Sequence, residues 1–448
     1  MLLLTILACG LWLSFAAAYP RSLVFPRGTA LPPSQDPFYK IPANISDYKP
    51  GDIINSRPVP QPVGLLHFQV NLAAAYQVLY RTTGPGNVST ATATTVMIPH
   101  NANFKKVLSY QAEMDTPFDE GFTSYVIQFD QQKLGNFLGR YGILWFVSML
   151  SKGWVVCSPD YEGPDGLFVN GIMSGRATLD GIRAVLRSKR STGVEKDAKV
   201  ALWGYSGGSL ATEFALELQG SYAPDLDKNI IVAASGGLPV DAAGVIKRLS
   251  GKLGAGLAMS GILGISKSTP QLRQYFLDSF VSKGKRDEFL PFEKSLAIPT
   301  VLRNLYRDVF GYFKDGEKFF EADVVQAVLR ENKMGSYGTP KVPYYVYHAV
   351  KDEVLPEADA KALIQSHCNN GAKIKYVREA FGEHVIVGLT GAAGAAKFLI
   401  DHMDGRGTQP GCDVESVVSS LLNPAAAASL TDIVFNEILA ILRLPLGK

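Results

Sequence analysis

A serine flanked by glycines, between a strand-like and a helix-like segment, constrains this chain more than any other feature. Residues 204–208 read Gly-Tyr-Ser-Gly-Gly, with an apolar run at 199–203 before them and a helical pattern over 209–218 after them. Because 43 of the 448 residues are glycine, the motif gains its weight from this position rather than from its letters. Such a nucleophile elbow needs small neighbours for a strained turn that exposes the hydroxyl. We predict that Ser206 is a nucleophile and that the N–H of Gly207 donates to an oxyanion; the alternative is an ordinary glycine-rich turn of a Rossmann-like protein.

The base that would activate Ser206 is predicted to be His384. A serine hydroxyl is a poor nucleophile until a base accepts its proton, and histidines follow Ser206 at positions 348, 367, 384 and 402. His384 lies in a loop after the strand-like residues 373–377 and before a helical segment rich in small residues, where a catalytic histidine belongs. His348 lies inside a strand-like run and is expected to be structural.

The acid that would orient His384 is expected at the end of the preceding strand. Asp352 and Glu353 are adjacent there, so their side chains diverge and only one can face the histidine. We predict Asp352, because its short side chain suits a tight turn. The alternative for either residue is a solvated surface carboxylate.

Strand-like and helical patterns alternate along most of the chain, with a helical pattern over 175–188 as one example. This alternation predicts an α/β fold, a mostly parallel sheet with helices on both faces. About a hundred residues after the strand-like run 229–234 lack a convincing strand and contain helical patterns. We predict a mostly helical cap or lid over 239–335, inserted into a core formed by 19–238 and 336–448.

Two further segments carry structural expectations. Residues 19–60 are rich in proline and polar residues, which predicts an extended leader on the domain surface. Residues 253–265 in the cap contain no charged side chain. One interpretation of that run is a mobile lid and acyl-chain tunnel lined by small residues, and the other is a buried cap helix.

The N-terminus predicts a secreted, extracellular protein. Residues 1–18 carry no charge, are mostly apolar and end in three alanines, as in a signal peptide cleaved after Ala18. A transmembrane anchor is disfavoured, because spanning a bilayer takes about 20 apolar residues. The sequons at Asn44 and Asn87 predict glycosylation, which agrees with secretion.

The cysteines predict one disulfide and no metal site. Cys9 would leave with the signal peptide, and Cys157 lies in an apolar strand-like run that suits a buried free thiol. Cys368 and Cys412 lie in polar, loop-like surroundings and are the expected disulfide. The sequence shows no CxxC pair and no Cys/His cluster, so we expect no structural metal.

The charge balance argues against a nucleic-acid partner. Lys and Arg number 44 and Asp and Glu 41, which gives a net charge of +3, and one short basic run occurs at 187–190. Binding to nucleic acid requires a concentrated positive face for the phosphates. We therefore expect no nucleic-acid partner.

Several motifs taken together resemble the fungal secretory lipase family: the elbow at 204–208, the loop at 158–163, the acid loop at 352–356 and the residues 382–384. Residues 31–39 are also similar to the family's leader. The resemblance implies an α/β-hydrolase core with a helical lid inserted after the sixth strand. It also implies that Ser206, Asp352 and His384 form a catalytic triad.

The resemblance implies two more features. Asp115, after the strand-like residues 108–111, would serve the oxyanion hole together with the N–H of Gly207, and its carboxyl would have to be protonated or hold a water as charge develops. The family's C-terminal disulfide matches Cys368 and Cys412. The family's other disulfide has no counterpart, because this chain has no cysteine near residue 120 or in the cap.

These observations predict a secreted serine carboxylic-ester hydrolase. The expected substrate is an acylglycerol at a lipid–water interface, hydrolysed as by a triacylglycerol lipase through an acyl-enzyme, without a metal or organic cofactor. One alternative is an esterase of the same fold that deacylates a secondary metabolite, as trichothecene deacetylases do. Another is a catalytically silent binding protein on a hydrolase scaffold.

Overall fold

The structure is a computed structural model of the chain. It describes residues 30–65, 68–129, 131, 142–409, 411–422, 424 and 445–446. The predicted signal peptide, residues 1–18, lies outside the described residues.

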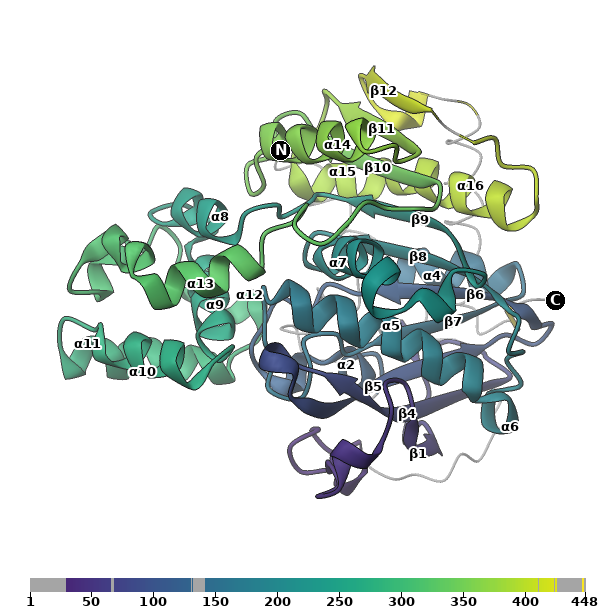
Figure 1. Cartoon of the computed structure of the whole chain (residues 1–448), viewed down its shortest axis with the longest axis horizontal. Coiled ribbons are helices and arrows are strands. Elements are labelled where there is room, and N and C mark those ends of the chain that lie inside the picture. Colours follow the sequence, from purple (N-terminus) through teal and green to yellow (C-terminus); the bar gives the residue numbers. More distant parts are fainter. Residues whose placement is uncertain are drawn as a thin grey trace, which may run out of the picture.

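A ten-stranded sheet forms the centre of the molecule (Figure 1). The strands in spatial order are β1 (Ile53–Pro58), β4 (Ala74–Thr83), β5 (Ser89–Ile98), β7 (Trp154–Pro159), β6 (Asn103–Gln111), β8 (Lys199–Tyr205), β9 (Ile230–Gly236), β10 (Tyr344–Ala349), β11 (Ile374–Glu379) and β12 (Cys412–Val417). The strands β6 to β12 pair in parallel, whereas β1, β4 and β5 pair antiparallel with their neighbours. A small separate sheet joins β2 (Gly64–Leu65) and β3 (Phe68–Gln69).

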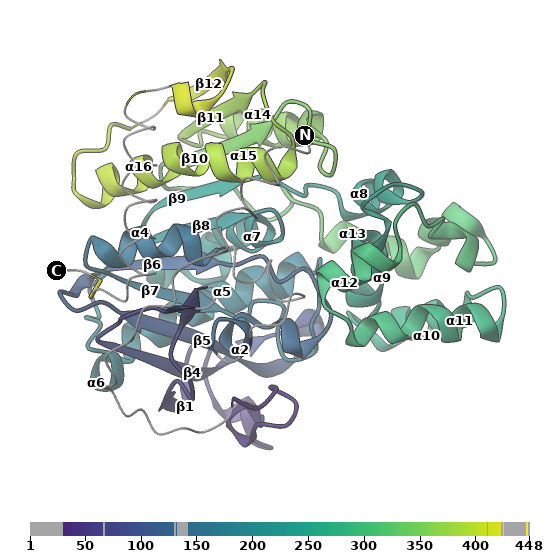
Figure 2. The same cartoon turned by 180° about the vertical axis from the view of Figure 1, so that it is seen from behind.

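Helices cover both faces of the sheet, as the alternating pattern predicts (Figures 1 and 2). On one face the core contains residues of α5 (Gly171–Arg187), α7 (Gly207–Tyr222) and α14 (Glu357–Asn369). On the other it contains residues of α4 (Ile143–Ser151), α15 (His384–Thr390) and α16 (Ala392–Met403). The short helices α2 (Thr123–Val126) and α6 (Lys189–Thr192) lie in connections.

Burial on two faces explains the composition of the central strands. In β8, Val200, Leu202 and Trp203 are fully buried, although they alternate between the two sides of the sheet. Each large apolar side chain buried in this way contributes roughly 1.5–3 kcal/mol. A continuous apolar run rather than an alternating one is therefore the sequence signature of these parallel strands.

Two edge strands differ from the sequence expectation. Residues 53–58 were expected to belong to an extended leader, but they form β1 at one edge of the sheet. Residues 412–417 form β12 at the opposite edge, and five of these six residues are exposed. An edge strand buries little apolar surface, so both segments lack the apolar run that marks the central strands.

The helices between β9 and β10 have a core of their own. They are α8 (Ala242–Leu249), α9 (Ala255–Ser266), α10 (Pro270–Asp278), α11 (Lys283–Phe289), α12 (Ala297–Arg303) and α13 (Asp323–Glu331). A core that contains a cluster of aromatic rings around Phe276, Phe289 and Phe313 joins all of these helices except α12. Both views show this group beside the sheet (Figures 1 and 2).

Local sequence signals set the starts of these helices. The Asp241 side chain accepts the N–H of Gly244 at the start of α8, and Thr269 accepts the N–H of Leu272 at the start of α10. Counted along the chain from β4, β9 is the sixth strand, so the helices follow the strand that the resemblance implies. We propose 239–335 as the boundary of this cap.

The helices α15 and α16 together, His384–Met403, are long and apolar enough by composition to cross a membrane. More than half of this stretch, 56%, is buried inside the protein. Leu399 and Ala396 are buried in the core on the β-sheet face that these helices cover. Packing against the sheet therefore accounts for the apolar composition of this segment.

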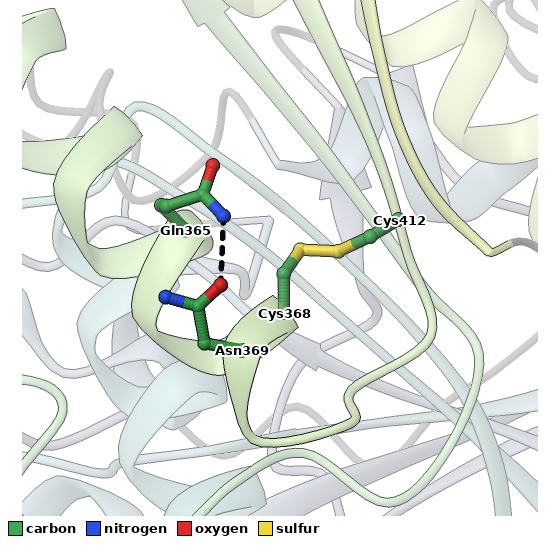
Figure 3. Close-up of a disulfide and its surroundings, with 4 residues drawn as sticks. All are labelled: Gln365, Cys368, Asn369 and Cys412. Atoms are coloured by element: carbon green, nitrogen blue, oxygen red, sulfur yellow. Dashed lines mark hydrogen bonds between the residues drawn. A yellow bond between two sulfur atoms is a disulfide. The ribbon is translucent and has the colours of Figure 1, made fainter.

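A disulfide joins Cys368 at the end of α14 to Cys412 at the start of β12 (Figure 3). Cys157 is free and buried in β7, at 1% exposure. The disulfide closes a 44-residue separation that contains β11, α15 and α16, and therefore His384. It fastens the edge strand β12 to the helix that packs under β10 and β11.

Removing this disulfide is predicted to destabilise the core. In the loop-entropy model, a disulfide that closes a segment of this length adds about 4 kcal/mol to the free energy of unfolding. Measured contributions are usually lower. The double variant Cys368→Ser/Cys412→Ser should therefore unfold at lower denaturant concentration than the wild type. Reductant should shift the wild type toward the variant and leave the variant unchanged. Equal midpoints for the oxidised wild type and the variant would contradict this role.

Candidate active site

The turn after β8 places Ser206 in a strained conformation. Ser206 has φ 52° and ψ −121°, a region that residues with a side chain rarely adopt, and it is the N-cap of α7. A Cβ added to Gly204 would lie 2.3 Å from the carbonyl oxygen of Gly208, and one added to Gly208 would lie 1.9 Å from that of Gln111. Both glycines are therefore required by backbone contacts, which is the packing that the elbow motif predicts.

Ser206, His384 and Asp352 lie in one line of hydrogen bonds. The Nε2 atom of His384 lies 2.8 Å from Oγ of Ser206, and Nδ1 lies 2.8 Å from Oδ2 of Asp352. The three residues follow the carboxyl ends of β8, β11 and β10, which the parallel sheet brings to one edge. This is the geometry in which a histidine can take the serine proton while the carboxylate orients the ring.

Asp352 is held as a carboxylate. Its Oδ1 accepts the backbone N–H groups of Val354 at 2.9 Å and Leu355 at 2.7 Å. Burial by itself would raise the pKa of Asp352, but the charge and hydrogen bond of His384, the charge of His348 and the Leu355 N–H outweigh it and lower the pKa below its usual range. The reciprocal effect holds for His384: burial would lower its pKa, and the charge and hydrogen bond of Asp352 outweigh that and raise it.

Glu353 and Tyr205 position the backbone of His384. The Oε2 atom of Glu353 accepts the His384 N–H at 2.8 Å, and the Tyr205 hydroxyl donates to the His384 carbonyl. The Tyr205 ring also lies beside the imidazole, with centroids 5.2 Å apart. The two neighbouring acids thus diverge as expected, one to the ring and the other to the backbone of the same histidine.

Asp115 lies against the turn that carries Ser206. Its backbone is also in the left-handed region, at φ 51°, and a Cβ added to Gly207 would lie 2.0 Å from Oδ1 of Asp115. Burial raises the pKa of Asp115 to about 6, and the nearby His384 charge opposes this rise. The carboxyl of Asp115 therefore lies beside Gly207 at the start of α7, next to Ser206, where the predicted oxyanion hole would be.

Two more carboxyls and a phenol surround Asp115, and sequence reasoning gave them no role. The side chains of Glu113, Tyr161 and Glu162 are buried. Burial raises the pKa of Glu162 well above its usual value, and the Asp115 charge adds to this. For Tyr161 and Glu162 the sequence signals were their place directly after the apolar strand and the resemblance of the loop at 158–163 to the family.

An apolar cavity opens from Ser206 into the cap. Its lining comes from the site, from β-sheet connections and from the cap: Asp115, Phe168, Val169, Ser206, Gly207, Leu210, Pro239, Ala242, Val245, Ile246, Leu249, Leu257, Ala258, Gly261, Val354 and Leu355. Residues 255–265 of the uncharged run belong to α9, which is mostly buried and lines this cavity with Leu257, Ala258 and Gly261.

The predicted glycosylation residues lie away from this site, whereas His348 lies next to it, with Nε2 3.6 Å from Oδ2 of Asp352. Asn44 and Asn87 are exposed, as a glycosylation site must be. His348 is buried inside β10, where its ring nitrogens contact the backbone of Leu238 and Leu355. Its role is therefore structural in this arrangement.

A buried polar cluster on α7 and α14 was not anticipated from the sequence. Ligand-type atoms of Glu213, Glu217 and His367 lie within 4.8 Å of one another. His367 bonds Glu213 at 2.7 Å, while Glu217 accepts the N–H groups of Gly335 and Tyr337 where the chain leaves the cap. These partners satisfy the cluster, which fastens the end of the cap to the helix after the elbow.

Comparison with known proteins agrees with this architecture. The sequence profile described as secretory lipase matches residues 128–411. The chain belongs to the secretory lipase family. Lipase A of Arthroderma benhamiae is 38% identical over 93% of this chain and 89% of its own length. A secreted triacylglycerol lipase of Malassezia furfur is 31% identical over 94% of this chain and 86% of its own length.

Solved structures confirm the predicted α/β-hydrolase fold. The X-ray structure of Candida antarctica lipase A superposes with a TM-score of 0.81 at 28% identity, covering 94% of this chain and 99% of that chain. A rice cell wall degrading esterase from Xanthomonas oryzae superposes with a TM-score of 0.60 at 15% identity, a likeness that concerns the fold alone. As a member of the secretory lipase family, the chain is a carboxylic-ester hydrolase.

Exchanging the two adjacent acids separately should distinguish their roles. Asp352→Asn is predicted to lower kcat on the order of 10⁴-fold, because a neutral amide cannot stabilise the imidazolium and favours the wrong tautomer. Glu353→Gln keeps an acceptor for the His384 N–H and should cost far less. Steady-state kinetics on a soluble ester measure both, and the opposite ranking would move the orienting role to Glu353.

The pH dependence should reveal the state of Asp115. In the role that we predict for Asp115, its acid form donates to the oxyanion, so this contribution is expected below pH 6 and should be lost as pH rises through the raised pKa of about 6. His384 must be neutral to act as a base, so its contribution appears only above its own raised pKa. Wild-type kcat/KM should therefore follow a bell-shaped curve.

Asp115→Asn should convert that bell into a single rising limb, since the amide donates at every pH. The limb should also move to lower pH, because the Asp115 charge is one of the groups that raise the pKa of His384. Asp115→Ala, the matched variant without a donor, should lose about 10²–10³-fold in kcat. A bell-shaped profile retained in Asp115→Asn would exclude Asp115 as the alkaline group.

Proposed function

We propose that this chain is a secreted triacylglycerol lipase that releases fatty acids from acylglycerols, with Ser206, His384 and Asp352 as its catalytic triad. The observation that carries the proposal is the hydrogen-bonded line of these three side chains at the mouth of an apolar cavity. The relatives named lipases support the reaction type.

The reaction would proceed through an acyl-enzyme. Oγ of Ser206 attacks the ester carbonyl while Nε2 of His384 accepts its proton and then delivers it to the leaving alcohol. The Gly207 N–H and the Asp115 carboxyl stabilise the oxyanion. A water molecule, activated by His384, then attacks the acyl-enzyme and frees the fatty acid.

The lining of the cavity favours a long acyl chain. Apart from Asp115 and Ser206, every lining side chain is apolar or absent, and many belong to α8 and α9 of the cap. A methylene chain in such a cavity gains roughly 0.8 kcal/mol for each buried CH₂. A short acyl group would leave most of this surface unused.

Secretion is the location we propose for this lipase. Three features support it: the signal-like residues 1–18, the exposed sequons at Asn44 and Asn87, and the disulfide between Cys368 and Cys412. Disulfides persist in oxidising, extracellular surroundings. Mass spectrometry of protein from the culture medium would test both the cleavage after Ala18 and the glycans.

A chain-length series tests the lipase against the deacetylase alternative. The wild type should hydrolyse p-nitrophenyl esters of long acids with higher kcat/KM than the acetate, and Ser206→Ala should abolish hydrolysis of all of them while remaining folded. A preference for acetate would favour the deacetylase.

A variant in the cavity sharpens that test. A Cβ on Gly261 would lie 3.5 Å from Ile246 without a clash, so Gly261→Leu should add its side chain to the cavity between Ile246 and Val169. Long-chain activity should fall at least tenfold, while acetate activity stays near that of the wild type. Gly284→Leu adds the same side chain to exposed helix α11 and is the matched control. Equal loss on all chain lengths would place the acyl chain elsewhere.

A further inference from the structure

Two neighbouring segments of the cap expose an unusual set of side chains. The loop between α8 and α9 presents Leu253, which is 57% exposed, and the end of α12 with the following turn presents Leu302 at 60% and Tyr306 at 66%. Backbone hydrogen bonds join the segments, from Gly251 to Arg307 at 2.8 Å and from Tyr306 to Lys252 at 2.9 Å. We call residues 247–253 and 302–308 together the cap face.

The cap face also concentrates positive charge. Its exposed charged residues are Lys247, Arg248, Lys252, Arg303, Arg307 and Asp308. Five of these six are basic, whereas the whole chain carries a net charge of only +3. Glu288 of α11 offsets part of this charge, since it lies 3.6 Å from Arg307. The charge is therefore a property of this face and not of the protein as a whole.

The backbone holds the apolar side chains outward. Tyr306 has φ 56°, in the left-handed region that non-glycine residues rarely adopt, and yet its ring is mostly exposed. With Leu305 and Arg307 it lines an open groove on the surface of the cap. Apolar side chains ringed by cations are the chemistry that binds an anionic lipid surface, with the apolar groups inserted and the cations at the charged head groups.

The cap face lies on the elements that form the acyl cavity. Leu249 of α8 and Leu257 of α9 line the cavity, and the loop carrying Lys252 and Leu253 connects these two helices. In addition, Arg248 donates to the carbonyl of Asp352 at 3.0 Å, which links α8 to the acid loop. A surface bound here would be next to the helices that receive the acyl chain.

We propose that the cap face docks this protein on lipid surfaces that carry ionised fatty acids. The proposal rests on the proposed function, because ester hydrolysis deposits fatty-acid carboxylates in the surface on which the enzyme works. Leu253, Leu302 and Tyr306 insert among the acyl chains, while Lys252 and Arg303 lie at the carboxylates. Hydrolysis thereby strengthens the binding of the enzyme to its own substrate surface.

Vesicle binding tests the proposal without relying on activity. Ser206→Ala protein, which leaves the lipids unchanged, is mixed with phosphatidylcholine vesicles with or without oleate, at a pH where oleate is ionised. We expect oleate to strengthen binding and added salt to reverse this, because salt screens exposed charges. Binding that is indifferent to oleate would overturn the proposal.

Matched variants locate the binding face. Lys252→Gln and Arg303→Gln, in the same background, should each weaken binding to oleate vesicles about fivefold. Arg190→Gln is the charge control, on α6 at the far end of the molecule from the cap (Figures 1 and 2). Unchanged binding in both cap variants, or an equal loss in Arg190→Gln, would contradict the assignment.

The apolar side chains are tested by Leu302→Ser and Tyr306→Asn, since asparagine tolerates the left-handed backbone at this turn. Both should weaken binding to all vesicles. In the active background, all four cap variants should hydrolyse a soluble short-chain ester at the wild-type rate. An inactive wild type that still binds oleate vesicles would refute the proposed function alone, whereas an active wild type without oleate-dependent binding would refute the docking alone.

Discussion

The position of the His384 imidazole is the constraint that the rest of the structure satisfies. Each ring nitrogen has a partner from a different strand end, Ser206 after β8 and Asp352 after β10. Glu353 and Tyr205 hold the backbone of His384, Glu353 by accepting its N–H and Tyr205 by donating to its carbonyl oxygen. A displacement of about 1 Å in such an arrangement can cost on the order of 100-fold in rate. The buried parallel sheet supplies the rigidity, because it brings three strand ends to a single edge.

The site also requires two carboxyls to behave in opposite ways. Asp352 accepts two backbone N–H groups and is hydrogen-bonded to Nδ1 of His384, so it stays ionised. Asp115 is buried, and burial raises its pKa to about 6 against the opposing effect of the His384 charge, so its neutral form is favoured more than in an exposed aspartate. Separating the pKa values of two like groups by their surroundings lets one orient a base while the other donates a hydrogen bond.

The cap is fastened to the core at positions that matter for the site. Glu217 of the elbow helix holds the backbone where the chain returns from the cap, and Arg248 binds the carbonyl of Asp352. The cap also supplies seven of the sixteen residues that line the cavity beside Ser206 through α8 and α9. Helix α8 thus connects the proposed docking face, the cavity and the acid loop.

Local sequence was sufficient where local physics decides the outcome. The elbow was predictable because a strained turn excludes side chains at Gly204 and Gly208, and the parallel strands because burial on both faces demands apolar runs. Ser206, His384 and Asp352 could be named from chain order and their places after strands. The role of Asp115 came only from family resemblance, since nothing in its local sequence separates it from a solvated acid.

Tertiary structure decided what depends on residues distant in sequence. The edge strands β1 and β12 bury little apolar surface, so their sequences show no strand pattern. They become strands because they pair with β4 and β11. Glu353 acquired its partner, and Glu113, Tyr161 and Glu162 their buried surroundings, only when separate loops met. The cap face likewise exists because two segments about fifty residues apart share backbone hydrogen bonds. A pattern in sequence records which side chains a segment must bury, but it does not record which distant segment will lie beside it.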